Sequence, residues 1–479
     1  MRPAAGAGRM ATQHGLGPSL RQTTVHPMHG QLCSAARHLR SLVGLTALAL
    51  LCGTAGVRAE TVAPAGLPNP LTLDDALGLI AEDHPDLALE RARLDAAQAG
   101  VTQAESLSGT RAFVDLTQQW VRPTDGADPT VPPEGDSVND SRARLIVSKR
   151  LYDFGRSRAL EESARLDVAG REQAYLDARA RRHIEVMARF FDVILADLRY
   201  AVDNEDMAQT YVRFDRSRER HRLGQISDVD LLEMENRYRE TLIQRTQSQK
   251  RQAAARAQLA LALNRPGVLP RDLARPALPS LKRELPDYNV LLERMRDSSP
   301  LLVAARRDVE AARATLTAER ARRRPVLSAE GEAAYYEREL RSRDELRATL
   351  NLRVPLYQGG EDSAAIAAAL ARVDEREARL KQLEFDLSQT VFDLVQELEI
   401  LQIERDAAGQ RLNYRSLYLD RSRGLYELEV RTDLGDAMTR LSEAQWLAAR
   451  ADFRAALAWA RIDALTGQLL DPPAKEPEP

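Results

Sequence analysis

Two aspartates near the end of the chain have the residue type and spacing for ion chemistry. Asp433 and Asp436 lie three residues apart where a long helix is expected to begin, so their carboxylates share one helical face. An acidic residue at such a position often only caps the helix or interacts with its dipole. The other interpretation, an ion site, needs further carboxylates from other copies of the chain. Both interpretations stay open on spacing alone.

No catalytic site is predicted elsewhere in the sequence. The histidines beyond residue 60, His84, His183 and His221, fall on separate helical stretches and do not have the spacing of a zinc site. The sequence has no glycine-rich phosphate loop and no Gly-x-Ser-x-Gly elbow. We therefore predict no enzyme activity, no cofactor and no bound metal.

The N-terminal region is typical of a secretory signal peptide. Arg37 and Arg40 precede the apolar run 42–51, which small residues follow up to Ala59. The run is too short to span a bilayer as a helix. We expect residues 1–59 to be removed, with translation beginning at Met1 or at an internal methionine.

The two cysteines lie in this removed segment. Without Cys33 and Cys52 the mature chain can form no disulfide. Cys52 leaves lipidation open as an alternative to simple cleavage. The expected product is an exported protein of a bacterial envelope.

The composition favours long helices with narrow apolar seams. Aromatic residues make up 5% and charged residues 29% of the 479 residues. No proline occurs between Arg156 and Arg222, and a helix of that length would be on the order of 100 Å long. Apolar residues at coiled-coil spacing are Ile184, Met187, Phe191, Ile194 and Leu198, and then Leu387, Val391, Leu394, Leu398 and Leu401.

The chain contains an internal duplication. The segment Leu151–Gly155 returns as Leu356–Gly360, and His84-Pro85 matches Ser299-Pro300. We expect a first repeat over residues 60–270, with a β-hairpin at 111–155 and long helices at 156–263. The second repeat spans 271–466, with a hairpin at 326–360 and long helices at 361–465, before a disordered tail at 467–479. Each repeat is expected to begin with one helix.

The predicted strands have one apolar face. From Leu346 to Leu356 apolar and polar residues alternate strictly, over about the length of one transmembrane β-strand. The stretch from Arg142 to Leu151 has the same alternation, broken by Ile146 and Lys149. A surface hairpin with one dry face is the other interpretation. Lipid on one side and water on the other explains the pattern better, because the narrow helical seams leave little to cover that face.

Four strands cannot close a barrel, and open edges are not tolerated in hydrocarbon. Several chains must therefore each contribute four strands. Twelve strands from three chains would form an open pore, whereas eight from two would be filled by side chains.

Together these features resemble the TolC-like outer membrane efflux protein family, the outer membrane factors of tripartite efflux and type I secretion systems. The resemblance rests on Leu71–Leu77 with His84-Pro85, and on the two strand-to-helix motifs from Leu151 and from Pro355. It implies an α+β membrane protein: a trimeric twelve-stranded outer-membrane β-barrel, four strands per chain, continued by a long periplasmic α-helical coiled-coil tunnel.

The resemblance also implies function and partners. Such proteins are passive exit ducts that extend from the bacterial outer membrane into the periplasm. They form homotrimers and bind a periplasmic adaptor protein, which belongs to an inner-membrane RND, ABC or MFS transporter. No nucleic-acid partner is expected. A periplasmic coiled-coil adaptor or scaffold without a pore is the alternative, and it would leave the two amphipathic hairpins unexplained.

Site residues follow from the family position of the two helix-to-helix turns. Leu223, Gly224 and Gln225 match the adaptor-docking turn, with Gln225 where an apolar residue is usual. Asp433 and Asp436 match the aspartates that line the pore, and a threefold ring of them would favour cations and bind polyvalent cations. Asp228, Asp230 and Arg431 are expected to contribute to closure of the tip.

Overall fold

The computed structural model describes residues 67–80, 84–121, 138–337, 344–428, 430 and 433–470. Residues 64–479 form one compact unit, and the description below is of that unit alone. The predicted signal segment 1–59, the predicted tip residue Arg431 and the end of the predicted tail lie outside the described residues. The first residues of that tail, 467–470, are described and form the capping turn of the last helix.

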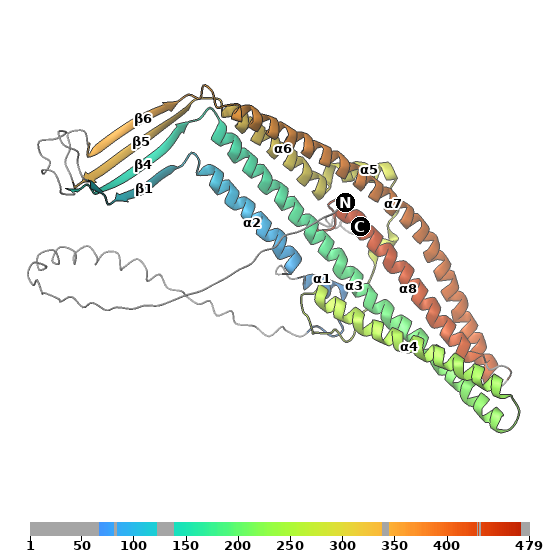
Figure 1. The fold of residues 1–479 in the computed structure, drawn as a ribbon. Helices are drawn as coiled ribbons and strands as arrows, with labels where there is room; N and C mark the ends of the chain where they lie inside the picture. Colours follow the sequence, from blue (N-terminus) through green and yellow to red (C-terminus); the bar gives the residue numbers. More distant parts are fainter. Residues whose placement is uncertain are drawn as a thin grey trace, which may run out of the picture. The chain divides into compact units, whose positions relative to one another are not determined.

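Both halves of the chain have the same order of main elements: two helices, two long strands and two long helices (Figure 1). The first half comprises α1 (Leu73–Gly78), α2 (Pro85–Glu105), β1 (Thr110–Thr117), β2 (Trp120–Val121), β3 (Val138–Asn139), β4 (Arg142–Tyr152), α3 (Arg156–Arg222) and α4 (Asp228–Ala262). The second half comprises the 3₁₀ turn η1 (Pro279–Lys282), α5 (Tyr288–Ser298), α6 (Pro300–Ala321), β5 (Val326–Tyr336), β6 (Leu346–Arg353), α7 (Glu361–Glu427) and α8 (Leu434–Leu465).

Each hairpin is preceded by two helices and not by the single helix expected. In the first half α1 ends at Gly78 and α2 begins at Pro85; in the second half α5 ends at Ser298 and α6 begins at Pro300. The residue before a proline is disfavoured in the α conformation and proline is favoured in the first turn of a helix, so each second helix begins at its proline.

The four long strands form one antiparallel sheet in the order β1-β4-β5-β6. The pairing of β4 with β5 joins the two halves, with Leu145 opposite Ala333. The hairpin predicted at 111–155 does not begin with one continuous strand, because β1 ends at Thr117 and the segment resumes as β2. The predicted strand 346–356 ends at Arg353, just before Pro355, which has no N–H to donate to a neighbouring strand.

The register places the apolar residues on one face of the sheet. One row across the strands is Val114, Leu145, Ala333 and Leu346, and the next is Ala112, Val147, Gly331 and Ala348. The opposite face carries charge, including Arg144, which contacts Asp115 at 2.8 Å and Glu332 at 3.7 Å. The two residues that break the alternation lie on the face opposite to their character. Lys149 lies on the apolar face, and Ile146 is buried on the charged face.

Helix α3 lies at the centre of the helical layer and α7 at its margin. α3 packs against α2, α4, α6 and α8, whereas α7 packs mainly against α6 and α8 (Figure 1). The predicted α7 seam, Leu387 to Leu401, is buried as expected. On α3 the buried residues extend beyond the predicted seam to Val186, Phe190 and Val193, and Phe191 stacks on Phe453 with 4.4 Å between ring centroids. A helix with neighbours on several sides needs more than one apolar stripe.

The strand-to-helix corners depend on left-handed backbone. Gly155 and Gly360, which precede α3 and α7, both have φ of +89°, where a Cβ would be strained. The residue before each of them is left-handed as well, Gly359 in the second repeat but Phe154 in the first. Phe154 makes an edge contact with the ring of Tyr152, 4.8 Å between centroids.

Asp153 caps α3 in place of its N-cap glycine. The carboxylate accepts hydrogen bonds from the backbone N–H and the hydroxyl of Ser157, and Arg150 lies 3.4 Å away. Burial raises the pKa of Asp153, but the hydrogen bonds from Ser157 and the charge of Arg150 outweigh it, so the pKa lies below its ordinary value. The second repeat has Gln358 at this position.

We expect Asp153→Ala to lower the free energy of unfolding by about 1 kcal/mol at neutral pH, because α3 loses its cap. Since the folded pKa is depressed, this stabilisation is present above the unfolded value of about 3.9 and is lost as the pH falls through the folded value. Denaturant titrations at several pH values would measure the difference. Gln358→Ala is the control, and an equal effect of the two changes would contradict the capping role.

Candidate functional site

The turn between α3 and α4 is a Schellman motif. Gly224 has φ of +71°, its N–H donates to the carbonyl of His221, and the N–H of Gln225 donates to that of Arg220. Leu223 is exposed over 59% of its surface and Gln225 is also exposed. The three residues expected to bind an adaptor therefore lie on the outside of a rigid turn.

The two aspartates after this turn are engaged locally. Asp230 forms a capping box with Ser227, whose hydroxyl and backbone N–H hold the pKa of the Asp230 carboxyl below its ordinary value. Asp228 is highly exposed, and its carboxylate lies 2.5 Å from Nε2 of His221. Both carboxylates thus stabilise the turn itself. The third residue expected to contribute to closure, Arg431, lies outside the described residues.

The turn between α7 and α8 positions the other two aspartates. Asp433 is the N-cap residue of α8, yet its side chain makes no capping hydrogen bond. Its Oδ2 accepts a hydrogen bond of 2.8 Å from the hydroxyl of Tyr418 on α7. Asp436, in the first turn of α8, accepts a hydrogen bond of 2.5 Å from Nη2 of Arg213 on α3. The capping interpretation is therefore not realised for Asp433.

Sequence reasoning did not find Arg213 or Tyr418. Arg213 is 223 residues from Asp436 along the chain, so no local spacing connects them. The contact depends on close packing of the two helices: a Cβ at Gly435 would lie 1.8 Å from the side chain of Gln209, one turn before Arg213 on α3. Gly435 is the only local signal that α8 approaches a neighbour at this point.

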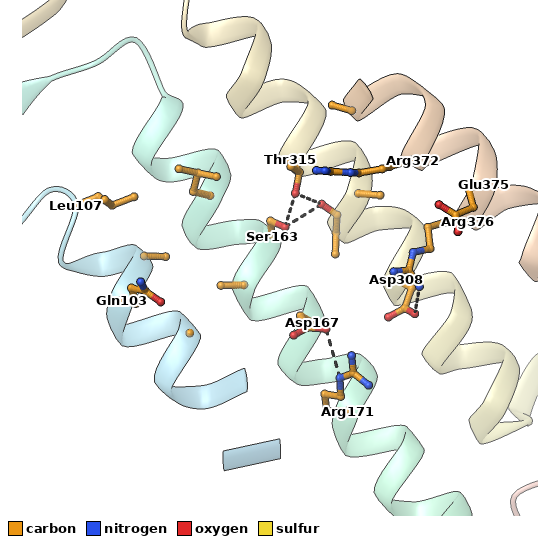
Figure 2. A pocket seen from close by; sticks show the side chains of 17 residues that line it. Gln103, Leu107, Ser163, Asp167, Arg171, Asp308, Thr315, Arg372, Glu375 and Arg376 are labelled. Atoms are coloured by element: carbon orange, nitrogen blue, oxygen red, sulfur yellow. Dashed lines mark hydrogen bonds and ion pairs between the residues drawn. The ribbon is translucent and has the colours of Figure 1, made fainter. Parts of the chain in front are cut away.

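Farther along the helices, α2, α3, α6 and α7 surround an open cavity of about 600 Å³ (Figure 2). Ser163 of α3 donates to the carbonyl of Ala311 and contacts the Thr315 hydroxyl, both at 2.9 Å. Burial raises the pKa of Asp308, while Arg376, 3.4 Å away, opposes that shift. Charged groups of both signs line the cavity, and most are paired with one another.

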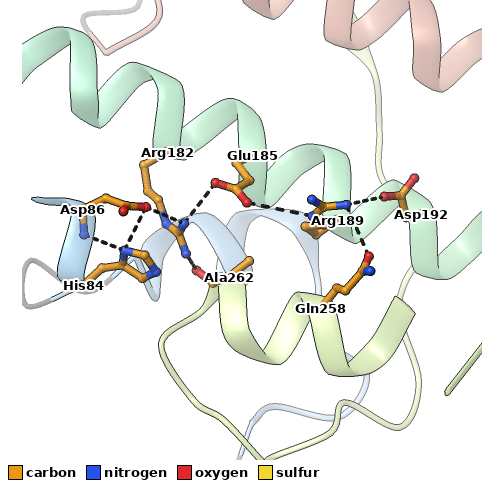
Figure 3. A network of polar contacts seen from close by, with 8 residues as sticks. All are labelled: His84, Asp86, Arg182, Glu185, Arg189, Asp192, Gln258 and Ala262. Atoms are coloured by element: carbon orange, nitrogen blue, oxygen red, sulfur yellow. Dashed lines mark hydrogen bonds and ion pairs between the residues drawn. The ribbon is translucent and has the colours of Figure 1, made fainter. Parts of the chain in front are cut away.

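A polar network joins the start of α2 to α3 and the end of α4 (Figure 3). Arg182 is buried, contacts Glu185 at 3.1 Å and Asp86 at 3.5 Å, and donates to the carbonyl of Ala262 in the last turn of α4. His84, the N-cap of α2, contacts Asp86 at 3.5 Å. These contacts cap helix ends and hold three elements together.

Among the described residues, no group of three or more histidine, cysteine, aspartate or glutamate side chains is arranged to hold a metal ion. None of the helices in the described ranges is apolar over enough of its length to cross a membrane. What the geometry offers instead is a pair of carboxylates at a helix start, an exposed turn, and a sheet with one apolar face.

Residues 291–468 match the family of outer membrane efflux proteins. A curated relative, Protein CyaE of Bordetella pertussis, is 28% identical over 260 residues, which cover 52% of this chain and 53% of CyaE. The chain thus matches about half the length of this relative.

Three solved structures share the fold. The outer membrane protein VceC of Vibrio cholerae has a TM-score of 0.66 at 17% identity, covering 82% of this chain and 96% of VceC. The CmeC outer membrane channel of Campylobacter jejuni has a TM-score of 0.68 at 12% identity, covering 83% and 86%. CusC has a TM-score of 0.66 at 16% identity, covering 84% and 92%.

The family match over residues 291–468 and the shared fold relate this chain to the outer membrane efflux proteins. The predicted resemblance to this family is confirmed, and with it the localisation at the bacterial outer membrane with an extension into the periplasm. The family is one of efflux proteins and not of enzymes.

Proposed function

We propose that this chain is one subunit of a homotrimeric exit duct, which conducts substrates passively across the outer membrane. The observation that carries the proposal is the four-stranded sheet with one apolar face. Among the described strands, β1 and β6 each pair on one side only. Because open edges are not tolerated in hydrocarbon, sheets from three chains would join edge to edge into a twelve-stranded barrel.

The spacing of tyrosines on the apolar face supports a membrane span. Tyr335 lies opposite Ala143 near one end of β4, and Tyr152 lies at the other end; both tyrosines are exposed. From residue 143 to residue 152 a strand extends roughly 30 Å, or about 23 Å across a bilayer at a tilt of about 40°. That height is close to the apolar band of about 25 Å between the aromatic girdles of outer-membrane barrels.

Exposed apolar stripes support closure of the helical part into a ring. On α7 the exposed residues opposite the buried seam share one face: Phe385, Phe392, Ile403, Tyr414 and Leu417. On α4 the exposed apolar residues on the side away from α3 also share one face: Val229, Leu232, Ile243 and Leu261. We propose that α7 of one subunit packs against α4 of the next, which would bury both stripes in a coiled-coil tunnel.

The tip of this tunnel would contain the gate. Threefold repetition of Asp433 and Asp436 would place six carboxylates around the opening and favour cations. Asp228, Asp230 and Arg431 would contribute to closure, the first two by holding the α3–α4 turn in shape. Leu223, Gly224 and Gln225 would bind a periplasmic adaptor that belongs to an inner-membrane RND, ABC or MFS transporter.

We expect Leu223→Glu to weaken adaptor binding at least tenfold, because a charge would replace an exposed apolar contact in a rigid turn. Binding of the purified trimer to its cognate adaptor would be measured by surface plasmon resonance. Leu269→Glu, at another exposed leucine in the segment after α4, is the matched control. Unchanged affinity of the Leu223 variant would place the docking surface elsewhere.

Fractionation and conductance test the proposed duct. We expect the full-length protein to remain in the outer membrane until detergent is added, to purify with the mass of three chains, and to form pores in planar bilayers. Release from membranes without detergent would favour the adaptor alternative. A folded trimer that never conducts, even after loss of the proposed tip contacts, would contradict the duct.

A further inference from the structure

The end of α3 is rich in arginine, and one of these arginines contacts the start of α8. Its last ten residues contain five arginines, Arg213, Arg216, Arg218, Arg220 and Arg222, against only two acidic residues, Asp215 and Glu219. Arg218 pairs with Asp215 at 2.6 Å and Arg222 with Glu219 at 2.5 Å, both within the helix. The other three, at spacings of three and four, share one helical face. We call Arg213, Arg216 and Arg220 the arginine face.

Arg213 is the member of the arginine face that reaches the proposed gate. Its guanidinium donates to Oδ1 of Asp436 across the contact between α3 and α8. The packing of Gln209 on Gly435, one turn earlier on α3, brings the two helices together at this point. Arg213 is about half exposed and Asp436 somewhat more, so the pair lies at the surface of the subunit, where ions in solution reach it.

We propose that Arg213 sets the ion selectivity of the pore by partly neutralising the Asp436 carboxylates. The inference rests on the proposed function, in which Asp433 and Asp436 line the opening. Three guanidiniums would then stand among six carboxylates and reduce the negative potential there. A polyvalent cation needs several free carboxylates at once, so it would bind more weakly than to aspartates alone.

Removing the charge of Arg213 is therefore expected to make the pore more cation-selective. For Arg213→Gln we expect the permeability ratio of K⁺ over Cl⁻, and the affinity for blocking hexamminecobalt(III), each to rise roughly two- to fivefold, which is the effect of one nearby unit charge in water reduced by salt. Reversal potentials in a KCl gradient and single-channel block would be measured on the detergent-purified full-length protein. Arg213→Lys keeps the charge and should behave as the wild type.

Arg218→Gln is the matched control, because it removes the same charge from the same helix but from a pair within α3. A rise in the permeability ratio of K⁺ over Cl⁻ and in the affinity for hexamminecobalt(III) for Arg213→Gln, with both unchanged for Arg218→Gln, would support the inference. Equal behaviour of the two variants would overturn it.

The same measurements separate this inference from the proposed gate. If Asp436→Asn lowers cation selectivity while Arg213→Gln has no effect, the gate stands and the role of Arg213 is wrong. If Asp436→Asn itself leaves selectivity and block unchanged in a conducting pore, the gate fails and the inference fails with it. Thermal unfolding of each variant would show whether Arg213 acts only on stability, a role that would shift the midpoint but not the reversal potential.

Discussion

Replacing Asp433 and Asp436 together by asparagine is expected to abolish cation selectivity and to weaken block by trivalent cations about tenfold or more. Six carboxylates would be lost from the proposed trimer. Even in water each nearby unit charge contributes about 1 kcal/mol to ion binding, and about 1.4 kcal/mol is a tenfold change. Asparagine has nearly the shape of aspartate, so the α8 start should keep its fold. Planar-bilayer recordings with hexamminecobalt(III) would measure both effects.

The contact of Asp436 predicts how its single variant behaves. Its carboxylate accepts a hydrogen bond from the Arg213 guanidinium, which already offsets part of its charge. Asp436→Asn should therefore reduce block less than the double substitution does. The control is Glu443→Gln, two turns farther along α8. Pores that ignore the double substitution would leave both aspartates with only structural roles.

A single arginine on the apolar face of the sheet is expected to prevent assembly of the pore. Val147 lies in the row with Ala112, Gly331 and Ala348, midway between the rows of Tyr335 and Tyr152. A charge at the bilayer midplane of an outer-membrane barrel costs about 2–4 kcal/mol. Each trimer would carry three such charges. We therefore expect Val147→Arg to lower the yield of folded trimer in the outer membrane severalfold or more.

Ser148→Arg is the matched control, because neighbouring residues of a strand face opposite sides of the sheet. Ser148 pairs with Arg111 and Glu330 on the charged face, which would line the pore. We expect this variant to assemble normally and to change conductance only. Membrane fractionation followed by gel analysis without heating would measure the trimer. Equal loss for both variants would argue against lipid on the apolar face.

The strands, the long helices and the corners between them were predictable because their signals are local. Period-two alternation predicts β6 from its own residues, and the absence of proline predicts α3. Pro85 and Pro300 were visible as well, but the short helices before them were not separated from the helices that follow. A proline marks where a helix begins and does not say whether another one ends there.

For α3, sequence periodicity was not sufficient to predict which residues are buried. The buried seam of α7 follows from the sequence because the buried residues from Leu387 to Leu401 fall in one helical stripe. α3 packs against α2, α4, α6 and α8 and is also contacted by α1, so Val186, Phe190 and Val193 are buried outside the predicted seam. Which face of a helix is buried depends on how many helices surround it, and that number is a property of the whole fold.

By itself the sequence determined the duplication, the amphipathic strands, the helix lengths and the resemblance to a family, because each of these depends on residues that are contiguous in the chain. It also placed Asp433 and Asp436 on one face of a helix start. Only the tertiary structure decided what those carboxylates contact. Arg213 and Asp436 meet because α3 and α8 pack against each other at Gly435. The two residues are 223 positions apart, and the periodicity of neither segment predicts such a contact.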